Sequence, residues 1–154
     1  MADMVEDMIL SYLREHSTMV LATYGPEGPW ATPVFYVNKG FRLYFLSEPT
    51  TRHSINLQGE QSVAAAITEN YWEWQTIRGL QLQGKAFLVR GTMEMAAALA
   101  SYCMKFPAVR QVLESPGSFK GVTAARWHCL VPEILKYTDN GKGFGQRFEL
   151  RLEN

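Results

Sequence analysis

The chain has few of the residues that disulfides, metal sites and covalent catalysis require. It contains two cysteines and three histidines among 154 residues. Cys103 and Cys129 lie too far apart for a CxxC pair, and the histidines lack the spacing of metal ligands. We therefore expect no metal site and interpret both cysteines as free thiols of the core. His128 and Cys129 are adjacent, and neighbouring side chains of a strand point to opposite faces, so they do not favour nucleophilic catalysis.

The chain also lacks a net charge and a long apolar run. Fifteen Lys and Arg residues balance fifteen Asp and Glu residues, so no global field attracts it to nucleic acid or to an anionic membrane. No run approaches the roughly 18 apolar residues of a transmembrane helix, and the first ten residues are acidic where a signal peptide would be basic. We expect a cytoplasmic protein without a nucleic-acid or membrane partner, in which a local cluster holds any bound anion.

The length and composition favour one folded unit. Hydrophobic residues make up 47% of the chain and aromatic residues 12%, which is ample material for a core. Chains of about 100–200 residues usually form one domain. No repeat, low-complexity tract or linker divides the sequence, so we expect a single domain over residues 1–154.

Short strands separated by turns account for most of the chain. The segments "TMVLATY" and "WATPVFYV" flank "GPEGP" and predict a β-hairpin. "NKG" leads into a third strand, "FRLYFLS", and "SVAAAIT" is a strand of small residues. "TIRGLQLQGKAFLVR" predicts a long strand bent at Gly84. Two further strands around "TAARWHCLV" and "EILKYTD", and a last one in "QRFELRL", complete the pattern.

Helical patterns are few and grouped. Residues 4–13 place their apolar side chains on one stripe, with Asp3 as a plausible N-cap. A helical composition over residues 93–106 ends at Pro107, and a short helix follows up to Ser115-Pro116-Gly117. Six or seven strands with these helices predict a mainly β, α+β fold. The architecture we expect is a closed or split antiparallel β-barrel with peripheral helices.

One junction, "SEPTTRHSINL", is far more polar than its surroundings. A strand ends at Leu46, and a short helix is predicted to run through Leu57. The hydroxyls of Thr50 and Thr51 and the guanidinium of Arg52 then lie at a helix N-terminus, where free N–H groups and the helix dipole favour an anion. Arginine adds a forked donor that matches phosphate oxygens. The alternative is an ordinary N-cap, with Thr50 bonded to a backbone amide and Arg52 in solvent.

The segments "ATPVFYV", "GFRLYFLSEPTTRHSINL" and "SVAAAIT" together resemble the N-terminal half of the FMN-binding split-barrel proteins related to pyridoxamine 5′-phosphate oxidase. Thr51 and Arg52 stand at the Ser/Thr and Arg of that family's Ser/Thr-Arg-Lys element. "IRGLQLQGKAFLV" is similar to the family's next strand, and "RWHCLVPEILKY" resembles its closing tryptophan strand. "KYTDNGKGFGQR" is similar to a small bacterial branch of the family. The resemblance covers about residues 19–147.

The resemblance implies a site for non-covalently bound FMN. It places two groups of residues at the cofactor: Ser47, Thr51, Arg52, His53 and Arg78 toward the phosphate, and Thr32, Pro33, Val34 and Trp127 toward the ring. For several of these the residues alone leave an alternative, because Arg78 could form a surface salt bridge and Val34 and Trp127 could belong to the core. Two positions depart from the family pattern. His53 replaces a lysine and is a weaker cation near neutral pH, and Gly79 stands where the oxidase has a glutamine at the flavin.

The resemblance further implies a homodimer with two flavins in grooves between two barrels. It implies an FMN-dependent oxidoreductase acting on an unidentified small molecule, in which the flavin carries the redox chemistry and no residue stands out as a catalytic acid, base or nucleophile. The ending "RLEN" lacks the Arg-Leu-Ala-Pro signature of the oxidase itself. The alternatives are a non-catalytic flavin- or haem-binding carrier or sensor, and a dimeric scaffold without cofactor. Trp72 and Trp74 could edge a substrate pocket or anchor the dimer.

Overall fold

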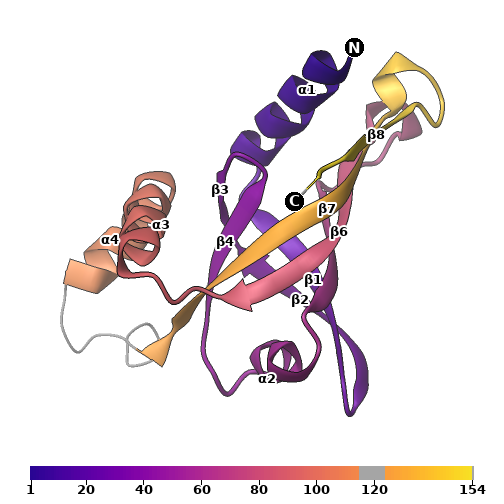
Figure 1. Cartoon of the computed structure of the whole chain (residues 1–154). Helices are drawn as coiled ribbons and strands as arrows, with labels where there is room; N and C mark the ends of the chain where they lie inside the picture. Colours follow the sequence, from indigo (N-terminus) through magenta and orange to yellow (C-terminus); the bar gives the residue numbers. More distant parts are fainter. Residues whose placement is uncertain (115–123, 154) are drawn as a thin grey trace.

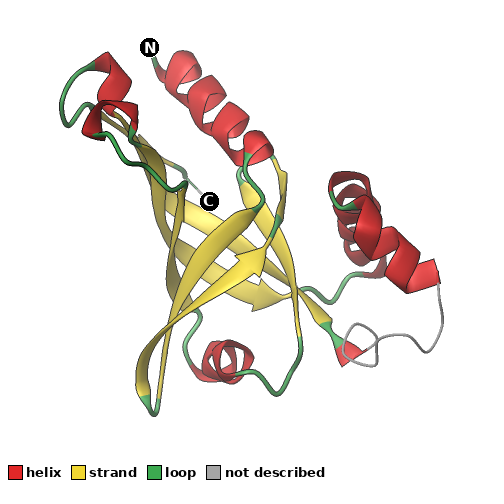
Figure 2. Ribbon diagram, turned by 180° about the vertical axis from the view of Figure 1, so that it is seen from behind, coloured by secondary structure: helices red, strands yellow, loops and turns green. Residues whose placement is uncertain are grey.

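The computed structural model describes residues 1–114 and 124–153. An antiparallel sheet curls into a split barrel, with helices at its ends and side (Figure 1, Figure 2). The strands are β1 Thr18–Gly25, β2 Gly28–Phe35, β3 Val37–Lys39, β4 Arg42–Ser47, β5 Ser62–Thr68, β6 Arg78–Leu88, β7 Arg126–Asp139 and β8 Arg147–Arg151. The helices are α1 Ala2–Glu15, α2 Arg52–Gly59, α3 Thr92–Lys105 and α4 Pro107–Glu114, with short 3-10 turns at Trp74–Thr76 and Asn140–Lys142.

The strand order is β2-β1-β5-β6-β7-β4-β3, and β8 pairs with β7. The sheet therefore has β2 and β3 at the two ends of its path and is not closed by hydrogen bonds between them, which makes the barrel a split one. The mainly β, split-barrel fold class is confirmed, as are the first hairpin, the small-residue strand and the helix that follows β4.

Alternation along the strands creates the core. In β1, Met19, Leu21 and Thr23 point inward and are buried, whereas Val20 and Tyr24 lie on the opposite face and are exposed. The largest fully buried side chains come from all parts of the barrel and include Tyr12, Tyr36, Phe45, Leu21, Leu43, Leu80 and Leu130. Burying each such side chain contributes about 1.5–3 kcal/mol. This apolar interior fixes the barrel on which the polar junction is mounted.

Helices cover the two ends of the barrel and one side (Figure 1). α1 covers one end and buries Val5, Ile9, Tyr12 and Leu13. α2 covers the opposite end, between the end of β4 and the start of β5. α3 packs on the side of the barrel, where Ala98 and Tyr102 join a second apolar cluster with Val37, Tyr44, Cys129 and Trp127. No helix in the described residues is long and apolar enough to cross a membrane.

Gly84 marks the predicted bend in β6. The β6–β7 register shifts between Gln83 and Gly84, and Gly84 lies opposite Pro132. A Cβ on Gly84 would lie 2.2 Å from the carbonyl oxygen of Val131, a distance that no side chain tolerates. Glycine is therefore required there, and the irregular pairing accommodates a proline within β7.

Three sequence predictions need correction. α1 begins at Ala2 with Met1 as N-cap, so Asp3 lies in the first turn, where its charge favours the helix dipole instead of capping the end. The two strands predicted around "TAARWHCLV" and "EILKYTD" are one continuous strand, β7, because the bulge at Gly84 absorbs the proline. The described residues form eight strands, not six or seven. The second predicted strand breaks at Tyr36 into β2 and β3, which offsets the joining of two predicted strands in β7. Residues 115–117, predicted to end α4, lie outside the described part.

Candidate functional site

The N-terminus of α2 has no side-chain cap. Thr51 is the N-cap residue, but its side chain makes no capping hydrogen bond. Thr51 Oγ1 instead donates to the carbonyl oxygen of Glu48 at 2.8 Å and lies 2.8 Å from Ser54 Oγ. The hydroxyl therefore stabilises the turn before the helix. The first-turn amides of α2 keep the free donors that attract an anion.

Ser47 and His53 form a buried polar pair beside that terminus. The distance from His53 Nε2 to Ser47 Oγ is 2.7 Å, and to Thr51 Oγ1 it is 3.4 Å. Both residues are only 6% exposed. Burial lowers the pKa of His53, and the neighbouring His128 lowers it further. His53 is therefore neutral near pH 7 and does not supply the positive charge of the family's lysine.

Arg52 lies against the tip of the β1–β2 hairpin. Its Nη2 donates to the carbonyl oxygen of Glu27 at 3.0 Å, and its guanidinium carbon lies 4.3 Å from the ring centroid of Trp30. The Glu27 carboxylate is 3.8 Å from Arg52 Nε, beyond hydrogen-bond distance. Arg52 Nε is buried and has no hydrogen-bond partner. The guanidinium is thus held in place while its buried Nε keeps a free donor.

Thr32, Pro33 and Val34 lie on β2, an edge strand of the sheet. One side of β2 therefore carries backbone groups without a partner strand, and Pro33 is tolerated because an edge strand needs no N–H there. Thr32 Oγ1 is buried without a hydrogen-bond partner. Trp30 and Thr32 share one face of the strand because they are two residues apart. Arg52, stacked on Trp30, therefore lies over the same face as the Thr32 hydroxyl.

Arg78 and Trp127 lie away from this group of residues in the folded chain. Arg78 begins β6 opposite Asp139, and its carbonyl oxygen accepts from the Tyr12 hydroxyl at 3.2 Å, so it lies at the α1 end. Trp127 pairs with Leu46 on β4, but its ring packs edge-on against Tyr102 of α3 at 5.3 Å. The chain therefore brings together Ser47, Thr51 and His53, and it places Arg52 over the face of β2 that carries Thr32. Arg78 and Trp127 do not join them.

Trp72 and Trp74 lie in the connection between β5 and β6. Trp72 is 92% exposed, and Trp74 packs edge-on against Phe144 at 5.3 Å. They are at the end of the barrel that α1 covers, because β6 starts there. A role for them in a pocket or at an interface stays a prediction.

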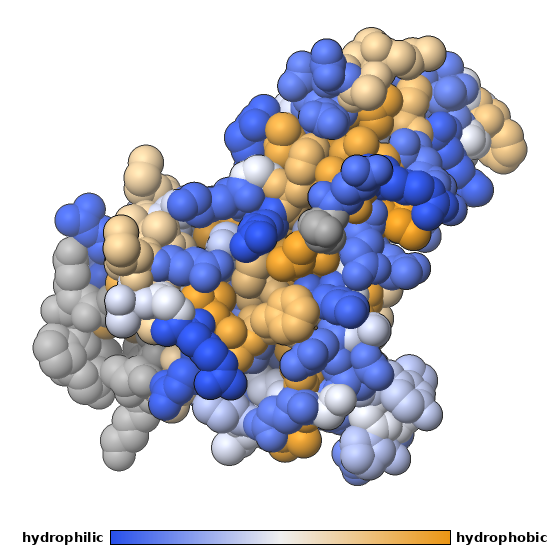
Figure 3. Space-filling view, viewed as in Figure 1, coloured by the Kyte–Doolittle hydropathy of each residue, from blue (hydrophilic) through white to orange (hydrophobic). Residues whose placement is uncertain are grey.

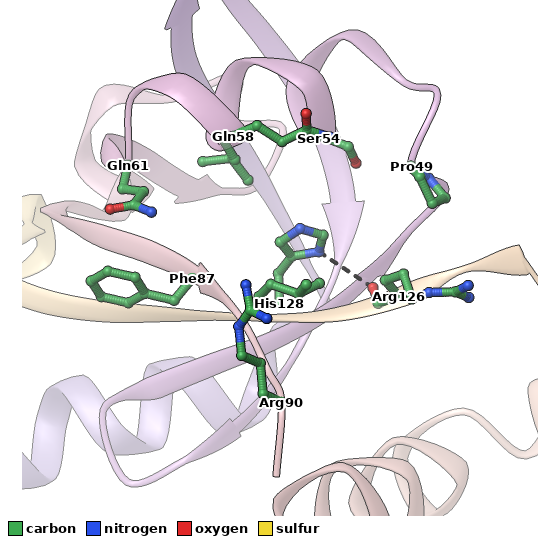
Figure 4. Close-up of a pocket in the computed structure, with 10 residues that line it drawn as sticks. Pro49, Ser54, Gln58, Gln61, Phe87, Arg90, Arg126 and His128 are labelled. Carbon is green, nitrogen blue, oxygen red and sulfur yellow. Dashed lines mark hydrogen bonds between the residues drawn. The ribbon is translucent and has the colours of Figure 1, made fainter. Parts of the chain in front are cut away.

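A cavity of about 530 Å³ opens on the other side of α2 (Figure 4). His128 lines it, is 6% exposed and stacks on Phe45 at 5.3 Å between ring centroids. Burial lowers the pKa of His128. Arg90 and Arg126 also line the cavity. Sequence analysis missed this group, since it considered His128 merely as the neighbour of Cys129. Strand alternation puts His128 and Trp127 on opposite faces of β7, and this could have indicated that His128 faces a separate space.

The described residues contain no cluster of three or more His, Cys, Asp or Glu side chains that could hold a metal ion. Both cysteines are free; Cys129 is buried and Cys103 partly so. Burial raises the pKa of the Cys129 thiol. A protonated, buried thiol is a poor nucleophile. The groups gathered at the start of α2 are hydroxyls, an imidazole and a guanidinium.

Comparison with known proteins establishes the family. A family model described as pyridoxamine 5′-phosphate oxidase matches residues 5–125, and the chain belongs to this family. A UPF0306 protein of Photorhabdus laumondii is 29% identical over 142 residues, covering 91% of this chain and 91% of that protein. A UPF0306 protein of Yersinia pseudotuberculosis is also 29% identical over 142 residues, covering 91% of this chain and 88% of its own.

Solved structures share the fold at lower identity. A haem binding protein from Mycobacterium smegmatis superposes with a TM-score of 0.70 at 22% identity, covering 91% of this chain and 56% of that one. HutZ, the haem storage protein from Vibrio cholerae, superposes with a TM-score of 0.67 at 20% identity, covering 83% of this chain and 89% of that one. At these identities the likeness is one of fold.

Proposed function

We propose that this protein binds FMN non-covalently and acts as an FMN-dependent oxidoreductase on a small molecule that is not identified. One observation carries the proposal. Three buried side-chain polar atoms in the described residues lack a hydrogen-bond partner, on Thr32, Arg52 and Tyr71, and two of these residues belong to the site that the family resemblance implies. A buried polar group without a partner costs about 1–3 kcal/mol. A ligand that satisfies Thr32 Oγ1 and Arg52 Nε would remove that cost.

The phosphate end of this site is the start of α2. The uncapped amides of the first turn and the Arg52 guanidinium are donors suited to a phosphate dianion. The Thr51 and Ser47 hydroxyls would join them by turning away from their present partners, Glu48 and His53. His53 adds a hydrogen-bonding imidazole. A dianion beside it would favour the protonated form and oppose the effect of burial on its pKa. The residues therefore fit the phosphate despite the missing lysine.

The ring end of the site is the edge of β2. Thr32 can donate its hydroxyl, the edge backbone can meet the polar rim of the ring, and Pro33 and Val34 supply apolar surface. When bound, FMN supplies the hydride and electron transfer. The protein's residues bind the phosphate, orient the ring along β2 and exclude water from one of its faces.

We also propose that the protein is a homodimer with the flavin near the subunit interface. Val20, Tyr24 and Phe35 expose 41%, 61% and 56% of their surface on the outer face of the β1–β2 hairpin. Apolar side chains are also exposed in the middle of the view in Figure 3. A second subunit would cover such surface. Arg78 and Trp127 lie away from the start of α2 in their own chain, so in this proposal they contribute to the flavin site of a second subunit.

Absorbance spectroscopy and titration test the flavin proposal. Freshly purified protein should show flavin absorbance or bind added FMN, and saturating FMN should raise its melting temperature. The proposal is wrong if FMN neither binds nor raises the melting temperature. Sedimentation should give about twice the chain mass of 17.5 kDa, and a monomer at micromolar concentration would exclude the shared site.

A second candidate is a non-catalytic haem-binding module. Its support is the fold shared with two haem proteins, together with His128, an imidazole that burial keeps neutral on a cavity wall. Neutral imidazole is the form that ligates metals. A Soret band on adding haem would favour this candidate. Steady NAD(P)H-dependent reduction of bound flavin would favour the oxidoreductase.

A further inference from the structure

The cavity beside α2 lies on the opposite flank of that helix from Arg52. Ser54, Leu57 and Gln58 face it, and successive residues of a helix turn by about 100°, so these positions point away from the hairpin that Arg52 contacts. The other walls come from the end of β6 and the start of β7 (Figure 4). Its volume of about 530 Å³ is within the range of small-molecule sites. The cavity therefore opens away from Arg52, but it borders the proposed phosphate site, where Thr51 Oγ1 lies 2.8 Å from Ser54 Oγ and Ser47 pairs with Arg126.

The lining of this cavity carries uncompensated positive charge. Among the described residues, the lining includes Arg90 and Arg126 and no Asp or Glu. Figure 4 shows the Arg90 guanidinium directed into the cavity beside His128, with Arg126 at its rim. Arg126 is anchored because its Nη1 donates to the carbonyl oxygens of Ala124 and Ala125 at 2.9 and 3.3 Å. Two guanidiniums and no carboxylate favour a negatively charged occupant.

His128 presents an acceptor to the same space. Its Nδ1 is 3.3 Å from the carbonyl oxygen of Arg126. A carbonyl oxygen only accepts, so the proton of the neutral ring is on Nδ1 and Nε2 keeps its lone pair. Ser54, Gln58 and Gln61 add further hydrogen-bonding groups along α2 and the turn after it (Figure 4).

Apolar side chains complete the wall. Phe87 and Leu88 are 41% and 43% exposed at the end of β6, and Leu57 faces them from α2. Exposed apolar surface beside two cations suits a ligand with an apolar body and an anionic group. We infer that this pocket binds a small organic anion, with Arg90 meeting the charged group and Phe87 meeting the apolar body.

A pair of isosteric probes tests the inference on the whole chain. 2-Naphthoate carries a carboxylate, and 2-naphthalenemethanol is its neutral counterpart. By calorimetry, naphthoate should bind more tightly than the alcohol, and added salt should weaken the binding of naphthoate alone. Arg90→Gln should weaken naphthoate by about 10- to 100-fold, the range for hydrogen bonds to charged groups, and leave the alcohol unchanged. Phe87→Ala should weaken both probes equally.

Matched variants separate this site from general electrostatics and from the flavin. Lys39→Gln removes one exposed charge at the end of β3, opposite the first residue of β4, and should leave both probes unchanged. Saturating FMN should also leave naphthoate binding unchanged, and competition between the two ligands would mean that the cavity belongs to the flavin site and would overturn the inference. The inference is overturned if millimolar naphthoate does not bind, if acid and alcohol bind equally, or if Lys39→Gln acts as strongly as Arg90→Gln. The fate of the flavin proposal does not depend on these outcomes.

Discussion

The two ends of the barrel both bury polar side chains, but they treat charge differently. At the α1 end, His16 Nε2 lies 2.6 Å from Glu69 Oε1, and the small hollow beside α1 is lined by two acids, Glu15 and Asp139, with Arg78 and Lys142. At the α2 end, His53 and His128 are kept neutral, and the described residues that line the 530 Å³ cavity include two arginines and no carboxylate.

The difference indicates a structural role for the α1 end of the barrel and a binding role for the α2 end. Where acidic and basic side chains meet inside one chain, their contacts hold α1 against the sheet without a ligand. Where donors and cations lack a partner, an external anion supplies it. Tyr71, whose hydroxyl is buried without a partner, is the exception. The following variants test whether the two ends of the barrel differ in this way.

Tyr12→Ala should have the largest effect. Tyr12 is 2% exposed, stacks on His16 at 3.8 Å and contacts Tyr137 edge-on at 5.3 Å. Removing a buried aromatic ring costs about 3–5 kcal/mol of the free energy of unfolding, measured by urea denaturation. Tyr24→Ala, at a 61% exposed position, should change it by no more than about 0.5 kcal/mol. A specific loss of FMN affinity in folded Tyr12→Ala protein would contradict the purely structural interpretation of this end.

Arg52→Ala should weaken FMN binding by about 1.5–3 kcal/mol, because a charge-assisted hydrogen bond to the phosphate is lost. Riboflavin, which lacks the phosphate, should be nearly unaffected. Calorimetric titration of both ligands measures the difference. Equal losses would mean that Arg52 does not contact the phosphate.

Arg78→Ala is the matched change at the α1 end. Stability should fall, and FMN affinity should fall as well, because the Arg78 of a second subunit is proposed to reach the cofactor. Unchanged FMN affinity would mean that one chain holds the whole phosphate site and that Arg78 is not part of it. Sedimentation of the same variant would then show whether the dimer persists.

Thr32→Val should move stability and binding in opposite directions. The substitution removes a buried hydroxyl without a partner, so the free energy of unfolding should stay equal or rise by about 1 kcal/mol. FMN and riboflavin should both bind more weakly, since the hydroxyl is proposed to meet the ring. Thr23→Val is the control, because Thr23 Oγ1 accepts from Asn56 Nδ2 at 3.1 Å. That variant should lose about 1–3 kcal/mol of stability, and the same loss in Thr32→Val would disprove the assignment.

The smallest effect is a dependence of stability on pH. Burial lowers the pKa of both His53 and His128. Below the ordinary histidine pKa of about 6.5, the unfolded chain binds protons that the folded chain does not yet bind. The free energy of unfolding should therefore fall as the pH falls below about 6.5, until the folded pKa values are passed. His128→Gln should flatten this slope in urea denaturation between pH 7.5 and 5, and an unchanged slope would show that His128 does not contribute.

Much of the fold followed from local pattern. Alternation and turn residues predicted the first hairpin and the small-residue strand, and a polar segment after an apolar strand predicted the start of α2. The predicted strand break near Pro132 was wrong, because what decides whether a strand accepts a proline is the bulge in its neighbour. The order of motifs also indicated the family, which the match over residues 5–125 bears out.

The polar turn before α2 and the start of that helix can be predicted from the sequence, because those features depend on neighbours a few positions apart. The positions of the side chains depend on the tertiary structure. It stacked Arg52 on Trp30, carried Arg78 to the other end of the sheet, and brought His53 close enough to His128, 75 positions away, to affect its pKa. The reason is physical: backbone propensity is local, whereas burial, charge balance and unpaired hydrogen-bonding atoms arise from strands that meet only when the barrel forms.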